Sequence, residues 1–373
     1  MKRLTLIAAV LALTATGLLA QNLSTPPSGN NQKCIVTQYI GAIAHVTVIY
    51  NSPDVDGREG QIWGQLVPYG LTQQGFGLNN PAPWRVGANE NTVIKFSHDM
   101  EVEGKPIKAG KYGLHLIVEE QGDWTWIFSH NHSAWGSYFY DEAEDALRVS
   151  VTPGDASFTE WLTFNFSDRQ PDAATLEMRW ENKRVPMRIN VPNSVELYAE
   201  TFARELQGSA GFNHLNWAAA ANFLAQNNHD LDLALEWAEH AINGQFVGVS
   251  DWTTLQTKAT VLMGKGDMHN ALTTMMEAVE HPSATPFQIH GFARQLIAQG
   301  MADKALEIFE YNYERFDGAW PTNVGMARGL SAVGRYDEAL KYAKLAHAEA
   351  PDQLNKDSMA AAVEKLKQKQ DIN

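Results

Sequence analysis

The hydrophobic and polar positions of this chain follow two different periods, and the change comes near residue 192. From 34 to 191, apolar and polar side chains alternate in short runs separated by turn residues, as in the run 46–50. Successive side chains of a strand point to opposite faces, so a period of two predicts β-strands. We expect about ten strands, the last two being Thr175–Trp180 and Val185–Val191, with no helical period between them, which is typical of an antiparallel β-sandwich.

After residue 192 the apolar positions follow a helical period and repeat at a fixed distance. Ala271-Leu272, Ala305-Leu306 and Ala339-Leu340 begin similar amphipathic runs 34 residues apart, and a glycine precedes each of them by five residues. This period and the small residues at its fixed positions resemble tetratricopeptide (TPR) repeats. The sequence therefore predicts a two-domain α+β protein, with an antiparallel β-sandwich followed by an α-helical TPR-like solenoid of about four stacked helix pairs.

The N-terminus has the pattern of a secretory signal. Lys2 and Arg3 precede an apolar run that ends in small residues near Ala20. The predicted organisation is a signal peptide at 1–20, a flexible segment at 21–33, the β-sandwich at 34–192 and the repeat domain at 193–373. We expect a periplasmic or secreted protein without a transmembrane anchor after signal removal.

The net charge argues against a nucleic-acid-binding protein, and the cysteine content excludes a protein stabilised by internal disulfides. The net charge is −14, and an acidic surface repels phosphate backbones, so we expect no nucleic-acid partner. The single cysteine, Cys34, excludes an internal disulfide, and we expect its thiol to be buried in a strand.

The β half resembles the DUF2911 family of secreted bacterial proteins. The matching pieces lie in the family's order between residues 35 and 191: Ser52-Pro53, Gly57-Arg58, Trp63-Gly64, Leu66-Val67-Pro68-Tyr69-Gly70, Trp84-Arg85-Val86-Gly87-Ala88-Asn89, Ala109-Gly110-Lys111-Tyr112, Trp124, Phe128, Trp135-Gly136, Asp145, Leu147-Arg148-Val149, Trp180-Glu181 and Arg184-Val185-Pro186. The chain departs from the family pattern at 71–83, an insert rich in Gly, Asn and Pro that should extend a surface loop. The resemblance implies a fold and a compartment but no reaction, since the family's function is unknown.

The candidate ligand site is the loop around Arg85 and Asn89. An arginine beside a tryptophan can hold a carboxylate or sulfate through two parallel hydrogen bonds. The alternative is that Arg85 binds backbone carbonyls of its own loop or pairs with Asp145 or Glu90, while Asn89 caps a turn. The other candidates for the same hollow are Tyr69, Trp84, His115 and Trp135.

A metal site is the weaker hypothesis. His130 and His132 would share a face if they lie on a strand, with His115 or Asp141 as a third ligand. The family pattern usually has no histidine at the first two positions, and surface histidines explain them as well. We assign no catalytic residue, cofactor or metal.

Two functions remain open at this point. The preferred interpretation is a binding or assembly protein of the bacterial cell envelope, because repeats are fused to a β domain without a recognisable catalytic motif. A protein or peptide would bind the helical repeats, and a small anionic or sugar ligand would bind the β domain. The aromatic side chains on the helices, Trp217, Phe223 and Trp252, are either part of that surface or core. The alternative is a carbohydrate-active or metal-assisted hydrolase that uses the aromatic β domain.

Overall fold

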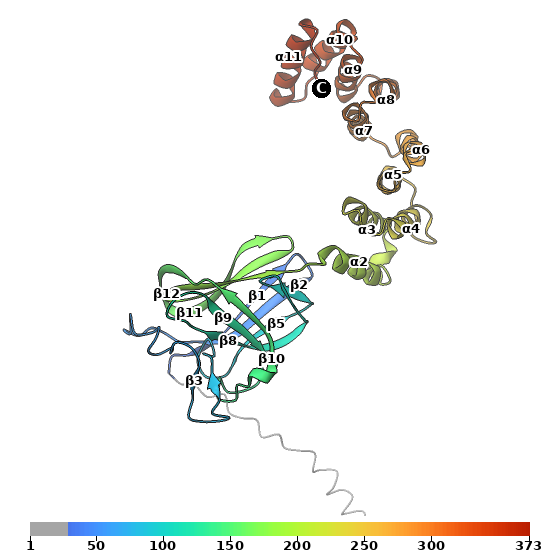
Figure 1. Ribbon diagram of the computed structural model, residues 1–373. Coiled ribbons are helices and arrows are strands. Elements are labelled where there is room, and N and C mark those ends of the chain that lie inside the picture. Colours follow the sequence, from blue (N-terminus) through green and yellow to red (C-terminus); the bar gives the residue numbers. More distant parts are fainter. Residues whose placement is uncertain (1–28) are drawn as a thin grey trace, which may run out of the picture. The chain divides into compact units, whose positions relative to one another are not determined.

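The protein consists of two compact units that meet at Ser194 and Val195 (Figure 1). The computed structural model describes residues 29–373, so the predicted signal peptide lies outside the described residues. Each unit has its own secondary structure, strands in the first and helices in the second, and each is described here by itself. None of the described helices is both long enough and apolar enough to cross a membrane.

The first unit is built from two antiparallel sheets. The larger sheet has the spatial order β1 (Gln32–Ile40), β2 (Ala44–Ser52), β5 (Thr92–Phe96), β8 (Gly110–Ile117), β9 (Trp124–Ser129), β10 (Asp145–Val151). The smaller has the order β11 (Gly154–Gln170), β12 (Ala173–Asn190), β6 (Met100–Val102), β7 (Lys105–Ile107). A separate hairpin, β3 (Thr72–Gln73) and β4 (Pro81–Ala82), comes from the predicted insert.

Alternating burial explains why these two sheets pack face to face. Val46 and Val48 on β2 are fully buried, whereas Thr47 between them and Ile49 after them are half-buried. Across the interface, the Tyr50 ring contacts the Phe164 ring of β11 edge-on with centroids 4.9 Å apart, and the Tyr50 hydroxyl accepts a hydrogen bond from the Phe164 backbone N–H. Trp126 of β9 also packs against Phe164, at 6.4 Å. Aromatic rings thus fill the space between the sheets.

Two predictions for the β unit were wrong in detail. Thr175–Trp180 and Val185–Val191 do not form separate strands, because β12 runs continuously from Ala173 to Asn190. Glu181 pairs with Thr159 of β11 between two shifts of register and has a positive φ of 51°. An irregularity of this kind produces the same polar interruption in sequence as a turn does. The thiol of Cys34 is not buried but half-exposed on β1, at the edge of the larger sheet.

The second unit contains ten described α-helices. A 3₁₀ turn at Ser209–Phe212 follows the first of them, and a 3₁₀ turn at Glu142–Glu144 lies in the β unit. The helices are α2 (Ser194–Glu205), α3 (His214–Gln226), α4 (Leu231–Asn243), α5 (Trp252–Gly264), α6 (Met268–Glu280), α7 (Pro286–Ala298), α8 (Ala302–Arg315), α9 (Trp320–Ala332), α10 (Tyr336–Ala348) and α11 (Gln353–Lys367).

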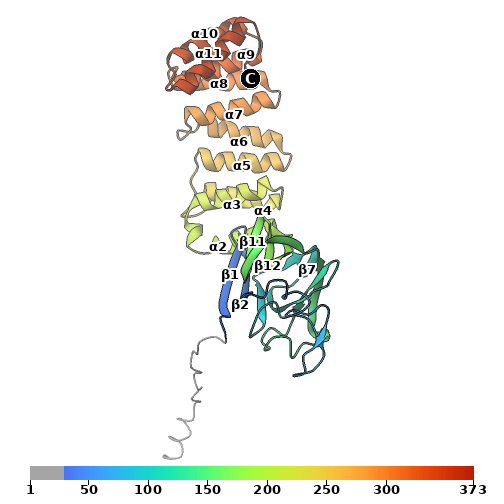
Figure 2. The same ribbon diagram turned by 90° about the vertical axis from the view of Figure 1, so that its left-hand side faces the viewer.

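Successive helices from α3 onward form antiparallel pairs that stack as layers (Figure 2). Gly266, Gly300 and Gly334 end the first helix of three pairs at φ values of 79°, 80° and 78°, so the repeated glycine marks a repeated turn. Ala293 and Ala327 are fully buried and allow close approach of neighbouring helices. The predicted fold class, a β-sandwich followed by a TPR-like solenoid, is confirmed.

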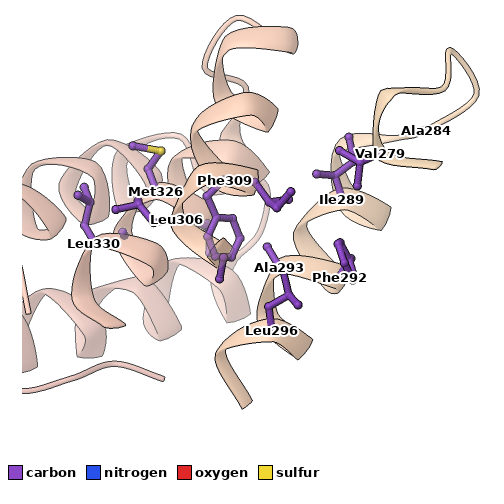
Figure 3. Packing of buried hydrophobic residues seen from close by; sticks show 14 of the residues in the cluster. Val279, Ala284, Ile289, Phe292, Ala293, Leu296, Leu306, Phe309, Met326 and Leu330 are labelled. Atoms are coloured by element: carbon purple, nitrogen blue, oxygen red, sulfur yellow. The ribbon is translucent and has the colours of Figure 1, made fainter. Parts of the chain in front are cut away.

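A continuous apolar core runs through the later repeats. Phe309 of α8 lies in its middle, with Leu330 on one side and Phe292 on the other (Figure 3). Gly325 and Gly329 of α9 leave room for the Phe309 ring, since an added Cβ would come within 2.5 and 2.7 Å of it. Of the aromatic candidates for a binding face, Trp252 is core, and Trp217 and Phe223 pack half-buried on their neighbours.

Candidate functional site

A cavity of the β unit surrounds the loop predicted as the ligand site. It has a volume of about 850 Å³ and is open to solvent. Its polar and charged lining residues are Asn30, Asn31, Asp54, Asp56, Arg58, Thr72, Gln73, Gln74, Arg85, Asn89 and Ser137. The pocket thus has the volume and polar groups of a small-molecule site.

The loop 84–91 is anchored on both sides of Arg85. Trp84 exchanges two backbone hydrogen bonds with Leu116 of β8, at 3.0 and 2.9 Å. Val86 is fully buried at a positive φ of 53°, an unusual conformation for a β-branched residue. Its carbonyl accepts a hydrogen bond from the Thr92 hydroxyl at 2.8 Å, and the Ala88 N–H donates to the Asn51 carbonyl. The surrounding contacts hold a strained backbone, a feature found often at binding sites.

Arg85 both stabilises this loop and faces the pocket. Its Nη1 donates a 2.8 Å hydrogen bond to the Asn89 carbonyl, and its guanidinium lies 5.1 Å from the ring centroid of Tyr138. An added Cβ on Gly136 would lie 2.3 Å from the Arg85 Cζ, so the guanidinium rests on a bare glycine. Among the described residues Arg85 has no carboxylate partner, so its remaining N–H groups are available to a ligand.

Arg58 lines the same pocket but has a structural role. Its Nε and Nη2 donate to the carbonyls of Val55 and Asp54, at 2.7 and 2.9 Å. Its Nη2 also lies 3.4 Å from the Asp54 carboxylate. Because these bonds use the Arg58 donors within its own turn, Arg85 is the arginine better placed to bind a ligand.

A buried histidine supports the floor of the pocket. The His115 Nδ1 lies 3.1 Å from the Ser137 hydroxyl, and Ser137 lines the cavity. Burial and the nearby Arg85 charge lower the pKa of His115 to about 4. The imidazole is therefore neutral near pH 7, and its part is to orient Ser137 rather than to carry charge.

The apolar wall includes Trp84 and Trp180, which form a cluster of four tryptophans with Trp63 and Trp124. The rings of Trp84 and Trp180 stack with centroids 5.8 Å apart and planes 15° apart, and both line the pocket. The Trp63 ring contacts both of them edge-on. The Trp180 Nε1 is a buried donor without a hydrogen-bond partner among the described residues. A buried donor beside a cavity can donate a hydrogen bond to a ligand.

The predicted insert borders the pocket. Thr72, Gln73 and Gln74 come from its hairpin and line the cavity. The Leu78 N–H donates to the Tyr138 carbonyl at 3.0 Å. This bond holds the insert next to Tyr138, whose ring contacts the Arg85 guanidinium. The insert thus forms part of the surroundings of Arg85.

The structure brings together three of the six predicted ligand-site residues at the cavity surface. Trp84, Arg85 and Asn89 line it, and His115 lies behind Ser137. Tyr69 does not line it, because its ring covers Gly64. Trp135 is 53 % exposed and also lies outside the lining. The structural role considered for Arg85 had two forms. The hydrogen bond to a backbone carbonyl of its own loop, that of Asn89, is present, and the ion pair with Asp145 or Glu90 is not.

Sequence reasoning missed Asp54, Asp56 and Trp180 as site residues. Asp54 and Asp56 are in a turn-rich stretch that reads as a simple connection, and Trp180 is far away in sequence on β12. The family motifs Gly57-Arg58 and Trp180-Glu181, which adjoin Asp56 and include Trp180, indicated that these segments matter. Without the pairing of the strands, however, the sequence could not show that these segments lie beside Arg85.

The histidines proposed for a metal do not lie on a strand. β9 ends at Ser129, and His130 and His132 follow in a loop where the His132 N–H donates to the His130 carbonyl. His115 pairs with Ser137, and Asp141 caps the 3₁₀ turn that follows it. The residues of the described range 29–373 contain no group of three or more His, Cys, Asp or Glu side chains placed to hold a metal ion.

Comparison with known proteins assigns the β unit to a family model. Residues 31–189 match the family described as "Protein of unknown function (DUF2911)", which confirms the resemblance seen in the motifs. No curated protein matches the chain. A structure described as "Crystal structure of YrrB: a TPR protein with an unusual peptide-binding site" is similar at 17 % identity and a TM-score of 0.31, covering 47 % of this chain and 87 % of that one. A structure of MamA AMB-1 is similar at 12 % identity and a TM-score of 0.28, covering 42 % of this chain and 84 % of that one.

Proposed function

We propose that this protein is a binding protein of the bacterial cell envelope, with a small-ligand site in its β unit and a protein-binding surface on its helical repeats. The observation that carries the proposal is the pocket around Arg85. It combines a guanidinium that has no carboxylate partner among residues 29–373, a stacked pair of tryptophans and several amide and hydroxyl groups. The N-terminal signal pattern supports the proposed location in the envelope.

The pocket chemistry favours a small polar ligand that carries an anionic group. Arg85 supplies donors for a carboxylate or sulfate, and the tryptophans supply a flat apolar wall. Asn89, Gln73 and Gln74 can bind hydroxyl groups. Sugar acids combine all three features and are the class we expect to bind.

Calorimetric titration of the whole chain tests this role. The probes are neutral monosaccharides, the corresponding uronic acids and short dicarboxylates, with tryptophan emission as a second readout. A uronic acid should bind, and Arg85→Gln should weaken its binding about tenfold or more, since a charged hydrogen bond contributes about 1.5–3 kcal/mol. Arg169→Ala, an exposed charge outside the pocket, is the matched control. Equal binding by Arg85→Gln and the unaltered chain would refute the site.

A second candidate, hydrolysis of a carbohydrate, is favoured by one observation. The carboxylates of Asp54 and Asp56 share the pocket with the tryptophan wall, and paired carboxylates are the usual groups of glycoside hydrolysis. Incubation with reducing-end-labelled oligosaccharides distinguishes the two candidates. Products that disappear in Asp54→Asn or Asp56→Asn would establish hydrolysis, whereas binding without products supports the binding protein.

A further inference from the structure

The helical unit contains a second pocket, in which two arginines occupy the same position of consecutive repeats. Arg294 is the ninth residue of α7 and Arg328 the ninth of α9, 34 residues apart, and both line a cavity of about 180 Å³. The corresponding residue of α5 is Thr260. The paired guanidiniums therefore belong to this pocket and are not a feature of every repeat.

The charges of these arginines are not neutralised inside the pocket. The lining residues contributed by α7, α9 and α11 include no aspartate or glutamate. Arg294 is exposed and has no hydrogen bond or ion pair to another described residue. Burial and the Arg294 charge lower the pKa of Arg328, and burial followed by both arginine charges lowers the pKa of His290 to about 4. The electrostatic potential in this pocket is therefore positive, although the whole chain carries a net charge of −14.

The charge of Arg328 is partly compensated, whereas that of Arg294 is not. Arg328 donates one 3.2 Å hydrogen bond to the Ile372 carbonyl, and the nearby Asp371 charge partly offsets its own. Asp371 itself accepts a hydrogen bond from Ser331 at 2.7 Å. The positive charge that remains comes mostly from Arg294, and a side-chain carboxylate is a group with which a guanidinium can form paired hydrogen bonds.

Part of the remaining pocket wall is apolar. Phe287 is 63 % exposed beside the arginines. Trp320 is fixed by a hydrogen bond from its Nε1 to the Ala346 carbonyl at 2.8 Å, and Val324 lies between it and Arg328 along α9. A ligand can therefore place an apolar group next to its carboxylate.

We propose that Arg294 and Arg328 bind the side-chain carboxylate of an acidic peptide segment of a partner protein, with a neighbouring apolar side chain against Phe287 and Trp320. This inference rests on the proposed protein-binding role of the helical unit. It is independent of the ligand of the Arg85 pocket, so the binding of uronic acids can succeed or fail separately.

An array of end-capped peptides of about ten residues tests the proposal with the whole chain. One set carries Glu or Asp beside Leu, a second carries Gln or Asn instead, a third has only a free C-terminal carboxylate, and a fourth carries phosphoserine. We expect selective binding of the first set, weakened by added salt because the pairing is electrostatic. Preference for any of the other three sets, or binding to none, would overturn the proposal.

Variants of Arg294 separate this site from general charge effects. Arg294→Ala should weaken binding of the first peptide set about tenfold or more, and Arg294→Lys should weaken it less. Arg294 makes no bond within the described structure, so its replacement should leave the unit folded. Arg335→Ala removes the same charge outside the pocket, at an exposed pair with Glu338, and should change binding less than about twofold. Equal losses in Arg294→Ala and Arg335→Ala would show that no specific pocket exists, while leaving binding by the helical unit intact.

Discussion

Arg85 donates a hydrogen bond to the carbonyl of Asn89, four residues later in its own loop, at 2.8 Å. The bond closes a loop in which Val86 and Asn89 both have positive φ values. One side chain thus stabilises the loop through one nitrogen and keeps other donors directed to the cavity. Loop stability and the proposed ligand binding are therefore linked at Arg85, and a substitution of this residue should affect both.

Gly136 separates the two roles, because it acts only through the position of Arg85. Alanine at this position would meet the guanidinium at 2.3 Å and would also be strained at a φ of 64°. We expect Gly136→Ala to displace Arg85, reduce unfolding free energy by about 2–4 kcal/mol and abolish ligand binding in the β unit. Urea unfolding and calorimetric titration measure the two effects.

Gly122→Ala is the matched control for backbone strain. Gly122 has a φ of 85° in the turn between β8 and β9, and an added Cβ would meet no atom within 4 Å. Its replacement should therefore lower stability by about 1–2 kcal/mol without changing ligand affinity. If Gly122→Ala and Gly136→Ala have the same stability and the same ligand affinity, Gly136 does not position the Arg85 guanidinium for binding.

The buried imidazole of His115 predicts a stability change at mildly acidic pH. Its pKa is about 4 in the folded protein, below the ordinary value of 6.5, so the unfolded chain binds more protons between these values. The stability contribution is complete above pH 6.5 and decreases as the pH falls towards 4, by about 3 kcal/mol at most. Hydrogen exchange of β8 peptides from pH 7.5 to 4.5 measures this change.

His115→Asn should flatten that pH dependence in the β unit. His290, whose pKa is also lowered to about 4, lies in the helical unit and serves as an internal reference, because exchange of α7 peptides should keep its pH dependence in the variant. An unchanged acid response of β8 in His115→Asn would mean that another group titrates there.

The architecture was predictable because both halves repeat a local pattern. In β2, Val46 and Val48 are buried and their neighbours less so, which the alternation of residue types shows directly. Gly300 and Gly334 mark turns at the same interval in sequence and in structure. Local periodicity reports which face of an element is buried, and burial determines the fold class.

The site was predictable only in part because it depends on contacts between distant segments. Arg85 and Asn89 could be identified within one loop, but Trp180 reaches them only through the pairing of β12 within the second sheet. Tyr69 was placed by its neighbours in sequence, and its ring turns instead to Gly64. Side-chain direction in an irregular loop has no period, so the sequence pattern carries no information about it.

The packing of Phe309 gives the last prediction, since it makes two helical glycines behave in opposite ways. An added Cβ on Gly325 of α9 would come within 2.5 Å of the buried Phe309 ring, whereas one on Gly291 of α7 would meet no atom within 4 Å. Alanine is the better helix former by about 1 kcal/mol, so Gly291→Ala should stabilise the helical unit by about that amount. Gly325→Ala should destabilise it by about 1–3 kcal/mol, because overpacking exceeds the gain in helix propensity.

Thermal unfolding of the whole chain, followed by hydrogen exchange of α8 and α9 peptides, measures both variants. Phe309→Leu should cost less stability in the Gly325→Ala background than in the unaltered chain, because the smaller side chain relieves the contact. Additive losses in the double variant would show that Gly325 does not make room for Phe309. In that case the small residues of α9 would be required for contact with another helix, and the core around Phe309 would tolerate larger side chains.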